Sequence, residues 1–289
     1  MGRILNKTAA ERPGVRIGRI DYTNVWPVFF HFPEHLLEEV EIVQAVPTTL
    51  NRAMAEGSIH LGPISSFGYA EHYEQYEIFP DLSVSCYGAV HSILLFHKKP
   101  LEELRFGKFA LPTTSATSVN LLKIIMEKFL EGRPEYVYCA PKLDDMLRQA
   151  DAALLIGDDA IRASWTRRDV MVTDLGQKWA ELTGRWMTFA VWAVRKDAIE
   201  RWPGVIQSVY QAFQRSKRIG LKNPRPIAER AVAEIGGSLT YWMHYFTNLN
   251  HDFGEPQQAG LSLYYRYAHE LGLLPRSVPI QLWTNHTVA

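Results

Sequence analysis

The chain has 289 residues, of which 47% are hydrophobic, and this length suits two α/β lobes, each with a buried core of its own. Its 31 basic residues balance its 31 acidic residues, which argues against the net positive charge that attracts nucleic acid or anionic membranes. The N-terminal sequence lacks the apolar core of a secretory signal, and no later run approaches the roughly 20 apolar residues of a membrane span. We expect a cytoplasmic protein that binds a small molecule and has no nucleic-acid or membrane partner.

Strand and helix patterns alternate along most of the chain. The expected strands cover residues 15–20, 40–46, 59–61, 82–97, 108–111, 152–156 and 189–194. The expected helices cover residues 50–55, 67–76, 116–130, the stretch around 161–163 and most of the chain after 196. This alternation predicts an α/β protein with parallel or mixed sheets, in which ligands bind beyond the carboxyl ends of the strands. The C-terminal helices are expected to pack against the first lobe.

The middle of the chain has strand and helix repeats of its own. Two extended apolar runs, 92–96 and 189–194, flank it and suit two crossovers between lobes. We therefore expect a discontinuous first lobe made of residues 1–97 and 190–289, and an inserted second lobe made of residues 98–189. A ligand cleft is expected between the two lobes.

Four strand-to-helix turns carry hydroxyl, amide or carboxyl side chains. In chain order they present Asn24; Ser65 and Ser66; Thr113, Thr114, Ser115 and Thr117; and Gly157 with Asp158. A helix N-terminus offers unpaired N–H groups and a partial positive charge, so each turn can bind a carboxylate without Lys or Arg. The alternative is ordinary capping, because Ser, Thr, Asn and Asp are preferred N-caps in any protein. The dense hydroxyl run after Pro112 favours binding, since a cap needs only one such residue.

Other chemistry has weaker support. His31 and His35 have the spacing of zinc ligands on a helix, but Pro33 between them breaks that helix. Cys86 and Cys139 form no CxxC pair, which favours reduced thiols over a disulfide or zinc site. Nucleotide-binding, serine-hydrolase and zinc-protease motifs are missing from the sequence. We expect neither a metal nor a cofactor.

Five segments, in this order, resemble the chorismate dehydratases of the futalosine route to menaquinone. They are IGRI at 17–20 with Tyr22, Asn24 and Pro27; PDLSVS at 80–85 with Gly88, Val90 and Ser92; TSATSV at 114–119; AALLIGD at 152–158; and FAVWAVR at 189–195. Asp21 departs from the small or neutral residue expected before the aromatic residue of the first segment. The resemblance covers about residues 16–195, and the C-terminal helices are similar only in general character.

The resemblance implies a periplasmic-binding-protein type II fold that works as an enzyme, with chorismate bound between the lobes. It implies loss of a ring hydroxyl as water and of a neighbouring ring proton, without a cofactor, to give 3-[(1-carboxyvinyl)oxy]benzoate. By similarity, Asn24 and Ser92 lie near the reacting part of the ring. The carboxylates are then bound by Ser65 and Ser66 and by the Thr114, Ser115 and Thr117 cluster, with Gly157 and Asp158 as further substrate contacts.

Three other functions remain open. A binding protein for a small carboxylate uses the same two-lobed fold without catalysis, although it normally carries an export signal. The enzyme that makes 1,4-dihydroxy-6-naphthoate in the same pathway is expected to place a histidine base in the cleft, and none of the four turns contains histidine. A transcriptional regulator needs a DNA-binding module, for which the sequence has no candidate.

Overall fold

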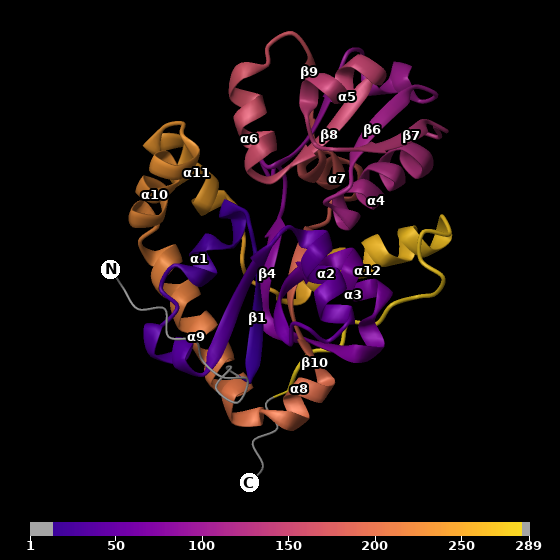
Figure 1. The fold of residues 1–289 in the computed structure, drawn as a ribbon. Coiled ribbons are helices and arrows are strands. Elements are labelled where there is room, and N and C mark those ends of the chain that lie inside the picture. Colours follow the sequence, from indigo (N-terminus) through magenta and orange to yellow (C-terminus); the bar gives the residue numbers. More distant parts are fainter. Residues whose placement is uncertain (1–13, 285–289) are drawn as a thin grey trace.

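The computed structural model describes residues 14–284 and consists of two α/β lobes (Figure 1). Residues 1–13, which include most of the stretch searched for a secretory signal, and residues 285–289 lie outside the described residues. Each lobe is built on a five-stranded mixed sheet. The predicted fold class, two α/β lobes with mixed sheets, is confirmed.

The sheet of the first lobe has the strand order β2-β1-β3-β10-β4. Its strands are β1 (Val15–Ile20), β2 (Val40–Ala45), β3 (Leu61–Ser65), β4 (Tyr76–Cys86) and β10 (Met187–Arg195). Strand β1 pairs in parallel with β2 and β3, whereas β10 runs antiparallel to β3 and β4. Because β10 lies inside the sheet and is buried over nearly its whole length, its sequence is a continuous apolar run.

The sheet of the second lobe has the order β7-β6-β8-β5-β9. Its strands are β5 (Ile93–His97), β6 (Lys108–Pro112), β7 (Glu135–Cys139), β8 (Ala152–Ile156) and β9 (Met171–Asp174). The sequence assigns residues up to 97 to the first lobe, but β5 pairs with β8 and β9 and so belongs to the second sheet. Five consecutive buried residues can enter either sheet, so the pattern alone does not say which. We propose that the chain crosses between lobes at residues 87–92 and 184–186.

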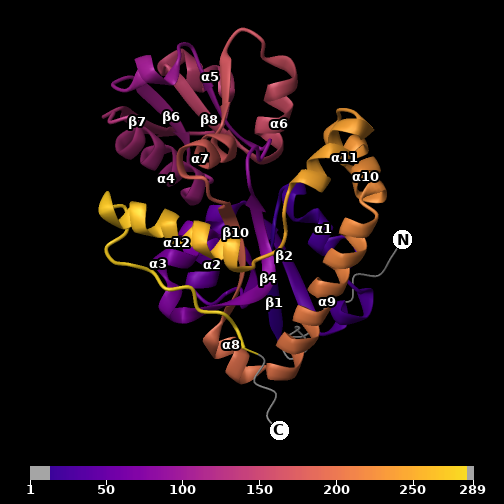
Figure 2. The ribbon, with the colours of Figure 1, turned by 180° about the vertical axis from the view of Figure 1, so that it is seen from behind.

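Helices cover both sheets (Figures 1 and 2). They are α1 (Trp26–Phe29), α2 (Pro47–Ala55), α3 (Ser66–Glu71), α4 (Ala116–Lys123), α5 (Leu143–Gln149), α6 (Gly157–Thr166), α7 (Leu175–Thr183), α8 (Lys196–Arg201), α9 (Pro203–Lys222), α10 (Arg225–Ile235), α11 (Leu239–Asn248) and α12 (Glu255–Glu270). Helix α9 packs on α1, and α12 packs on β10. The expectation that the C-terminal helices pack against the first lobe is therefore confirmed.

Several elements differ from the sequence prediction. Strands β7 and β9 and helices α5 and α7 are not predicted. Both strands lie at sheet edges and none of their residues is fully buried, so their apolar periodicity is weak. The sequence predicts a turn at residues 62–66, whereas β3 continues to Ser65. Gly62 allows this with a φ of +138°, a conformation that side chains other than glycine rarely adopt.

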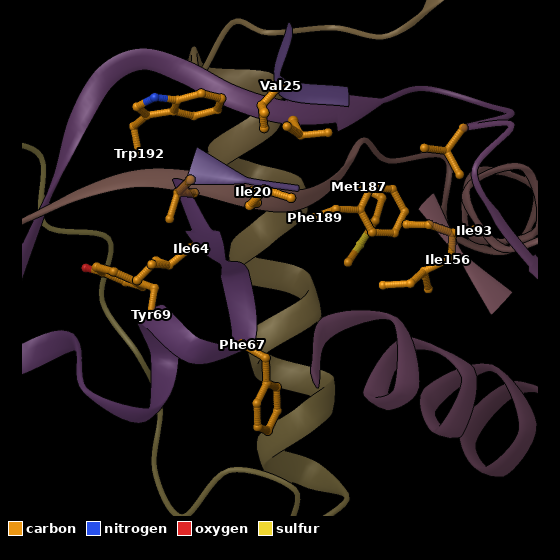
Figure 3. Close-up of a cluster of buried hydrophobic side chains, with 14 of the residues drawn as sticks. Ile20, Val25, Ile64, Phe67, Tyr69, Ile93, Ile156, Met187, Phe189 and Trp192 are labelled. Atoms are coloured by element: carbon orange, nitrogen blue, oxygen red, sulfur yellow. The ribbon is translucent and has the colours of Figure 1, made fainter. Parts of the chain in front are cut away.

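One hydrophobic cluster joins the two lobes. It contains Ile20 and Phe189 from the first lobe together with Ile93 and Ile156 from the second, and Figure 3 shows Ile93 and Ile156 next to Met187 and Phe189. The junction between the lobes is therefore apolar, and polar side chains that contact a ligand there must come from the strand-to-helix turns.

Between residues 14 and 284, no helix is long and apolar enough to cross a membrane.

Candidate functional site

A pocket lies between the lobes, where the strand-to-helix turns meet. Its cavity volume is about 40 Å³, below the roughly 300–1,000 Å³ usual for small-molecule sites, so a ring compound would enter only if the lobes moved apart. Its lining residues are Ile20, Tyr22, Asn24, Pro47, Ser65, Ser92, Ile93, Ser115, Thr117, Ser118, Ile156, Gly157, Phe189 and Ala190. Residues from all four predicted turns are therefore brought together in one pocket.

Six of the nine predicted site residues line this pocket: Asn24, Ser65, Ser92, Ser115, Thr117 and Gly157. Tyr22 and Ser118 line it as well, although neither is among the nine predicted site residues; Ser118 ends the hydroxyl run that favours binding. The remaining three, Ser66, Thr114 and Asp158, are absent from the lining. Two of these three, Ser66 and Asp158, have hydrogen-bond partners inside the protein.

Ser66 and Asp158 use their polar atoms inside the protein. Ser66 is fully buried; its hydroxyl donates to the Thr188 carbonyl at 2.7 Å, and its own carbonyl accepts from Tyr265. Asp158 accepts from the backbone N–H of Thr23 at 3.3 Å and from the Thr23 hydroxyl at 2.6 Å. The sequence cannot distinguish them from ligand contacts, because each directly adjoins a residue that does line the pocket.

Thr114 lies near Tyr22, and its buried hydroxyl has no hydrogen-bond partner among the described residues. Burial raises the pKa of the Tyr22 phenol to about 12. The phenol therefore stays protonated at neutral pH. Its ring packs against Gly157, where an added Cβ would lie 2.5 Å from Tyr22 Cδ1, and Gly157 has a φ of +61°. Only glycine suits this position, since both the space and the backbone conformation exclude a side chain.

Ser65 is oriented by two donors. Its Oγ accepts from the N–H of Gly68 at 3.0 Å, as the N-cap of α3, and from Nδ2 of Asn51 at 2.8 Å. A hydroxyl has two acceptor positions and one proton. With both acceptor positions occupied, Ser65 keeps its proton for a ligand in the pocket.

The second lobe contributes hydroxyls from the start of α4. Ser115 caps this helix, accepting from the N–H of Ser118 at 3.3 Å. The Thr117 hydroxyl accepts from the N–H of Phe67 in the first lobe at 2.9 Å, so it links the two lobes. Ser115 and Thr117 can both still donate a proton, so the second lobe adds two donors to the pocket.

Asn24 and Ser92, the two residues expected near the reacting part of a ligand, both line the pocket. Asn24 Oδ1 is buried and has no hydrogen-bond partner among the described residues. The Ser92 hydroxyl donates to the Val90 carbonyl at 3.3 Å and accepts from the Tyr245 hydroxyl at 3.2 Å. An unpaired buried amide oxygen costs roughly 1–3 kcal/mol, so a ligand that donates to Asn24 would recover this energy.

The pocket is neutral. None of the described lining residues is Asp, Glu, His, Lys or Arg, so a bound anion must be held by hydroxyls, amides and backbone N–H groups. Such donors suit carboxylates when helix N-termini supply them. The apolar walls around Ile93, Ile156 and Phe189 suit a carbon ring. The chemical groups that line the pocket therefore suit a small cyclic carboxylate.

The Asp158 contact leads to a prediction about the dependence of stability on pH. Burial raises the pKa of Asp158 in the folded state, while hydrogen bonds from Thr23 oppose the rise. An acid with a raised folded pKa stabilises the fold below its unfolded pKa, near 3.9, and loses this contribution as pH rises through the folded value. We therefore expect Asp158→Asn to match or exceed the stability of the unmutated protein at pH 7, with the difference shrinking towards pH 4.

Urea unfolding of both proteins between pH 4 and pH 7 measures this difference. Asp158→Ala is the comparison variant, because it leaves the Thr23 donors unpaired and should lose roughly 1–3 kcal/mol. Equal losses in the Asn and Ala variants at every pH would show that the charge itself is required.

Comparisons with known proteins bear on what this pocket binds. A family profile described as menaquinone biosynthesis matches residues 15–270. The chorismate dehydratase of Thermus thermophilus is 35% identical over 277 residues, which cover 91% of this chain and 96% of the relative. The region that matches the family profile, residues 15–270, includes every residue that lines the pocket.

Three solved structures show how widely the fold occurs. A protein of Archaeoglobus fulgidus has a TM-score of 0.73 at 20% identity, covering 90% of this chain and 98% of its own. The periplasmic aliphatic sulphonate-binding protein of Escherichia coli has a TM-score of 0.67 at 16% identity, covering 93% and 92%. A Candida albicans protein described as having the generic periplasmic binding protein fold has a TM-score of 0.63 at 9% identity, covering 94% and 99%. At these identities the likeness establishes the fold alone.

Proposed function

This chain belongs to the menaquinone biosynthesis family, and from that membership we propose that it is a chorismate dehydratase, a hydro-lyase that converts chorismate to 3-[(1-carboxyvinyl)oxy]benzoate and water. The observation that carries the proposal is 35% identity to a chorismate dehydratase along 91% of the chain. The neutral, hydroxyl-lined pocket supports it, because chorismate is a carbon ring with two carboxylates. A cytoplasmic location and independence from cofactors remain predictions of the sequence.

We assign the two carboxylates of chorismate to opposite sides of the pocket. Ser65 in the first lobe and Ser115, Thr117 and the start of α4 in the second lobe supply the donors. Ile93, Ile156 and Phe189 contact the ring between them. Closure of the lobes around the substrate removes water, which strengthens each hydrogen bond to the anion.

Asn24 and Ser92 are assigned to the reacting edge of the ring. One ring carbon loses its hydroxyl and the adjacent carbon, which carries the enolpyruvyl ether, loses its proton. The product ring is aromatic, so much of the driving force lies in the substrate, and the protein has mainly to orient the ring and stabilise the departing hydroxyl. Neutral hydrogen-bonding groups are sufficient for that task.

The described lining residues include no ionisable base other than Tyr22, whose pKa is raised to about 12. We therefore propose that the enolpyruvyl carboxylate of chorismate itself takes the ring proton and passes it to the departing hydroxyl, so that water leaves without net proton exchange. This carboxylate lies one ether linkage from the carbon that is deprotonated. The pocket holds it at the required distance.

Two chorismate analogues test this assignment. Neutralising the enolpyruvyl carboxylate as an amide is expected to lower kcat by more than about 100-fold, the usual size of a general-base contribution. Neutralising the ring carboxylate instead should chiefly raise KM, because that group only binds. Product formation is followed by mass spectrometry, and similar kcat values for the two analogues would contradict the role of the substrate carboxylate.

Unmutated protein and chorismate also distinguish the competing functions. Binding without turnover favours a non-catalytic binding protein for a small carboxylate. The naphthoate-forming enzyme of the same pathway is disfavoured, because no histidine is among the described lining residues.

A further inference from the structure

The end of α11 and the loop after it lie directly behind the two residues assigned to the reacting edge. Tyr245 and His251 are both almost fully buried, and neither lines the pocket. Each nevertheless makes a hydrogen bond to one of the two assigned residues, His251 to Asn24 and Tyr245 to Ser92. The sequence gives no sign of this, because 227 residues separate His251 from Asn24.

His251 is bonded to the backbone of Asn24. Its Nε2 lies 2.8 Å from the Asn24 carbonyl oxygen, and a carbonyl can only accept, so Nε2 carries the proton. Burial lowers the pKa of His251 to about 4, so the ring is neutral at physiological pH and remains a donor through Nε2. The bond therefore fixes the backbone from which the Asn24 amide projects.

The loop that carries His251 is itself tied to the first sheet. The N–H of Ser83 donates to the His251 carbonyl at 3.1 Å, and Asn250 and Ser85 exchange two backbone hydrogen bonds of 2.9 Å. The buried ammonium of Lys217 bonds Asp252 at 2.8 Å and Asp81 at 2.9 Å. His251 therefore connects strand β4 to Asn24 through hydrogen bonds, so the position of Asn24 depends on that of β4.

Tyr245 acts on Ser92 from the same segment. Its hydroxyl donates to Ser92 Oγ at 3.2 Å, and burial raises its pKa, so the phenol stays protonated. An oxygen that accepts a hydrogen bond becomes a better donor through its own proton. The Ser92 proton would have to turn from the Val90 carbonyl to the departing hydroxyl, and the bond from Tyr245 holds Ser92 Oγ in place and strengthens it as a donor once it has turned.

We propose that Tyr245 and His251 are positioning residues that set the separation and orientation of Ser92 and Asn24. The proposal rests on the proposed function, since it assigns these two contacts to the dehydration. Both contacts originate within seven residues of one segment, so a shift of that segment would displace both sides of the reacting edge together. A misplacement of about 1 Å can cost about 100-fold in rate.

The first test compares His251→Leu with His251→Gln. Leucine fills similar volume without a donor, whereas glutamine can donate its amide N–H to the Asn24 carbonyl. We expect kcat for chorismate to fall about 30-fold in the leucine variant with KM changed less than about 3-fold, and to recover to within about 5-fold in the glutamine variant. His97→Leu is the control, because His97 is also a buried histidine, but its ring nitrogens bond Lys99 and Thr173 and not the residues of the reacting edge. Its kcat should stay within twofold.

Equal losses of kcat in the Leu and Gln variants, or a loss in His97→Leu of the same size, would overturn the proposal. If His251→Leu does not fold, Tyr245→Phe decides, since it removes one oxygen and keeps the packing; its expected loss is about 10-fold in kcat, and no loss overturns the role of Tyr245. If the unmutated protein fails to dehydrate chorismate, the proposed function fails first. Crystal structures of the variants then decide the positioning role, and an unchanged spacing of Asn24 and Ser92 contradicts it.

Discussion

Replacing Asn24 with alanine is expected to lower the turnover of chorismate by about 100-fold or more, the cost of removing one hydrogen-bonding group from a developing charge. The same change should leave the melting temperature unchanged or slightly higher. Asn24 Oδ1 is buried without a partner among the described residues, so its removal relieves an unpaired group and breaks no bond. Loss of activity without loss of stability separates a substrate contact from an ordinary helix cap.

Steady-state kinetics with chorismate and thermal unfolding of the same preparation measure both quantities. Asn120→Ala is the matched control: this asparagine is also buried, but its amide donates only to the Ala116 carbonyl within α4. It should keep kcat within about twofold while losing roughly 1 kcal/mol of stability. A parallel fall of activity and melting temperature in Asn24→Ala would identify Asn24 as structural.

Gly62→Ala is expected to destabilise the protein by about 4 kcal/mol, the sum of backbone strain and overpacking. The φ of +138° at Gly62 suits glycine alone, and an added Cβ would lie 2.4 Å from the Gly18 carbonyl oxygen and 2.9 Å from the Gly18 nitrogen. Both contacts are with the backbone of β1, which pairs in parallel with β3. Relief would require separating two paired strands, so no side-chain movement can absorb the methyl group.

Urea unfolding measures the loss, and Gly204→Ala provides the control. Gly204 lies in the first turn of α9, and an added Cβ would meet no atom within 4 Å. That variant should gain roughly 0.5–1 kcal/mol, because alanine restricts the unfolded chain and favours helix. If the two variants differed by less than about 1 kcal/mol, the close approach of β1 and β3 would not be important for stability.

Together these variants separate the two tasks of the first lobe. Gly62 lets β3 run close to β1 and continue to Ser65, which caps α3 at the edge of the pocket. Asn24 comes shortly after the end of β1, the strand that pairs with β3. The packing of the sheet brings both residues to one edge, while the unpaired amide oxygen at that edge remains available to a ligand.

Local pattern was sufficient to predict much of the fold. Strands at 15–20 and 152–156 were predicted with the bounds that the structure has, because buried runs bounded by polar turns identify strands without tertiary information. Ser65 and Ser115 follow the same logic, since a hydroxyl at the first position of a helix is a local signal. The sequence therefore determined the two-lobed α/β class, the strand-to-helix turns and the hydroxyl character of the site.

Tertiary structure decided which members of each turn face the pocket and which residues support them. Ser65 lines the pocket while its neighbour Ser66 bonds Thr188, and Gly157 lines it while Asp158 bonds Thr23. Adjacent residues point in different directions once their helix packs against the rest of the protein. The sequence of a turn does not specify how that helix packs. The sequence of an apolar strand such as β5 does not specify which sheet it joins. The sequence around His251 likewise does not specify that it bonds Asn24. Contacts between segments far apart in the chain depend on the packing of the whole molecule, which no local pattern contains.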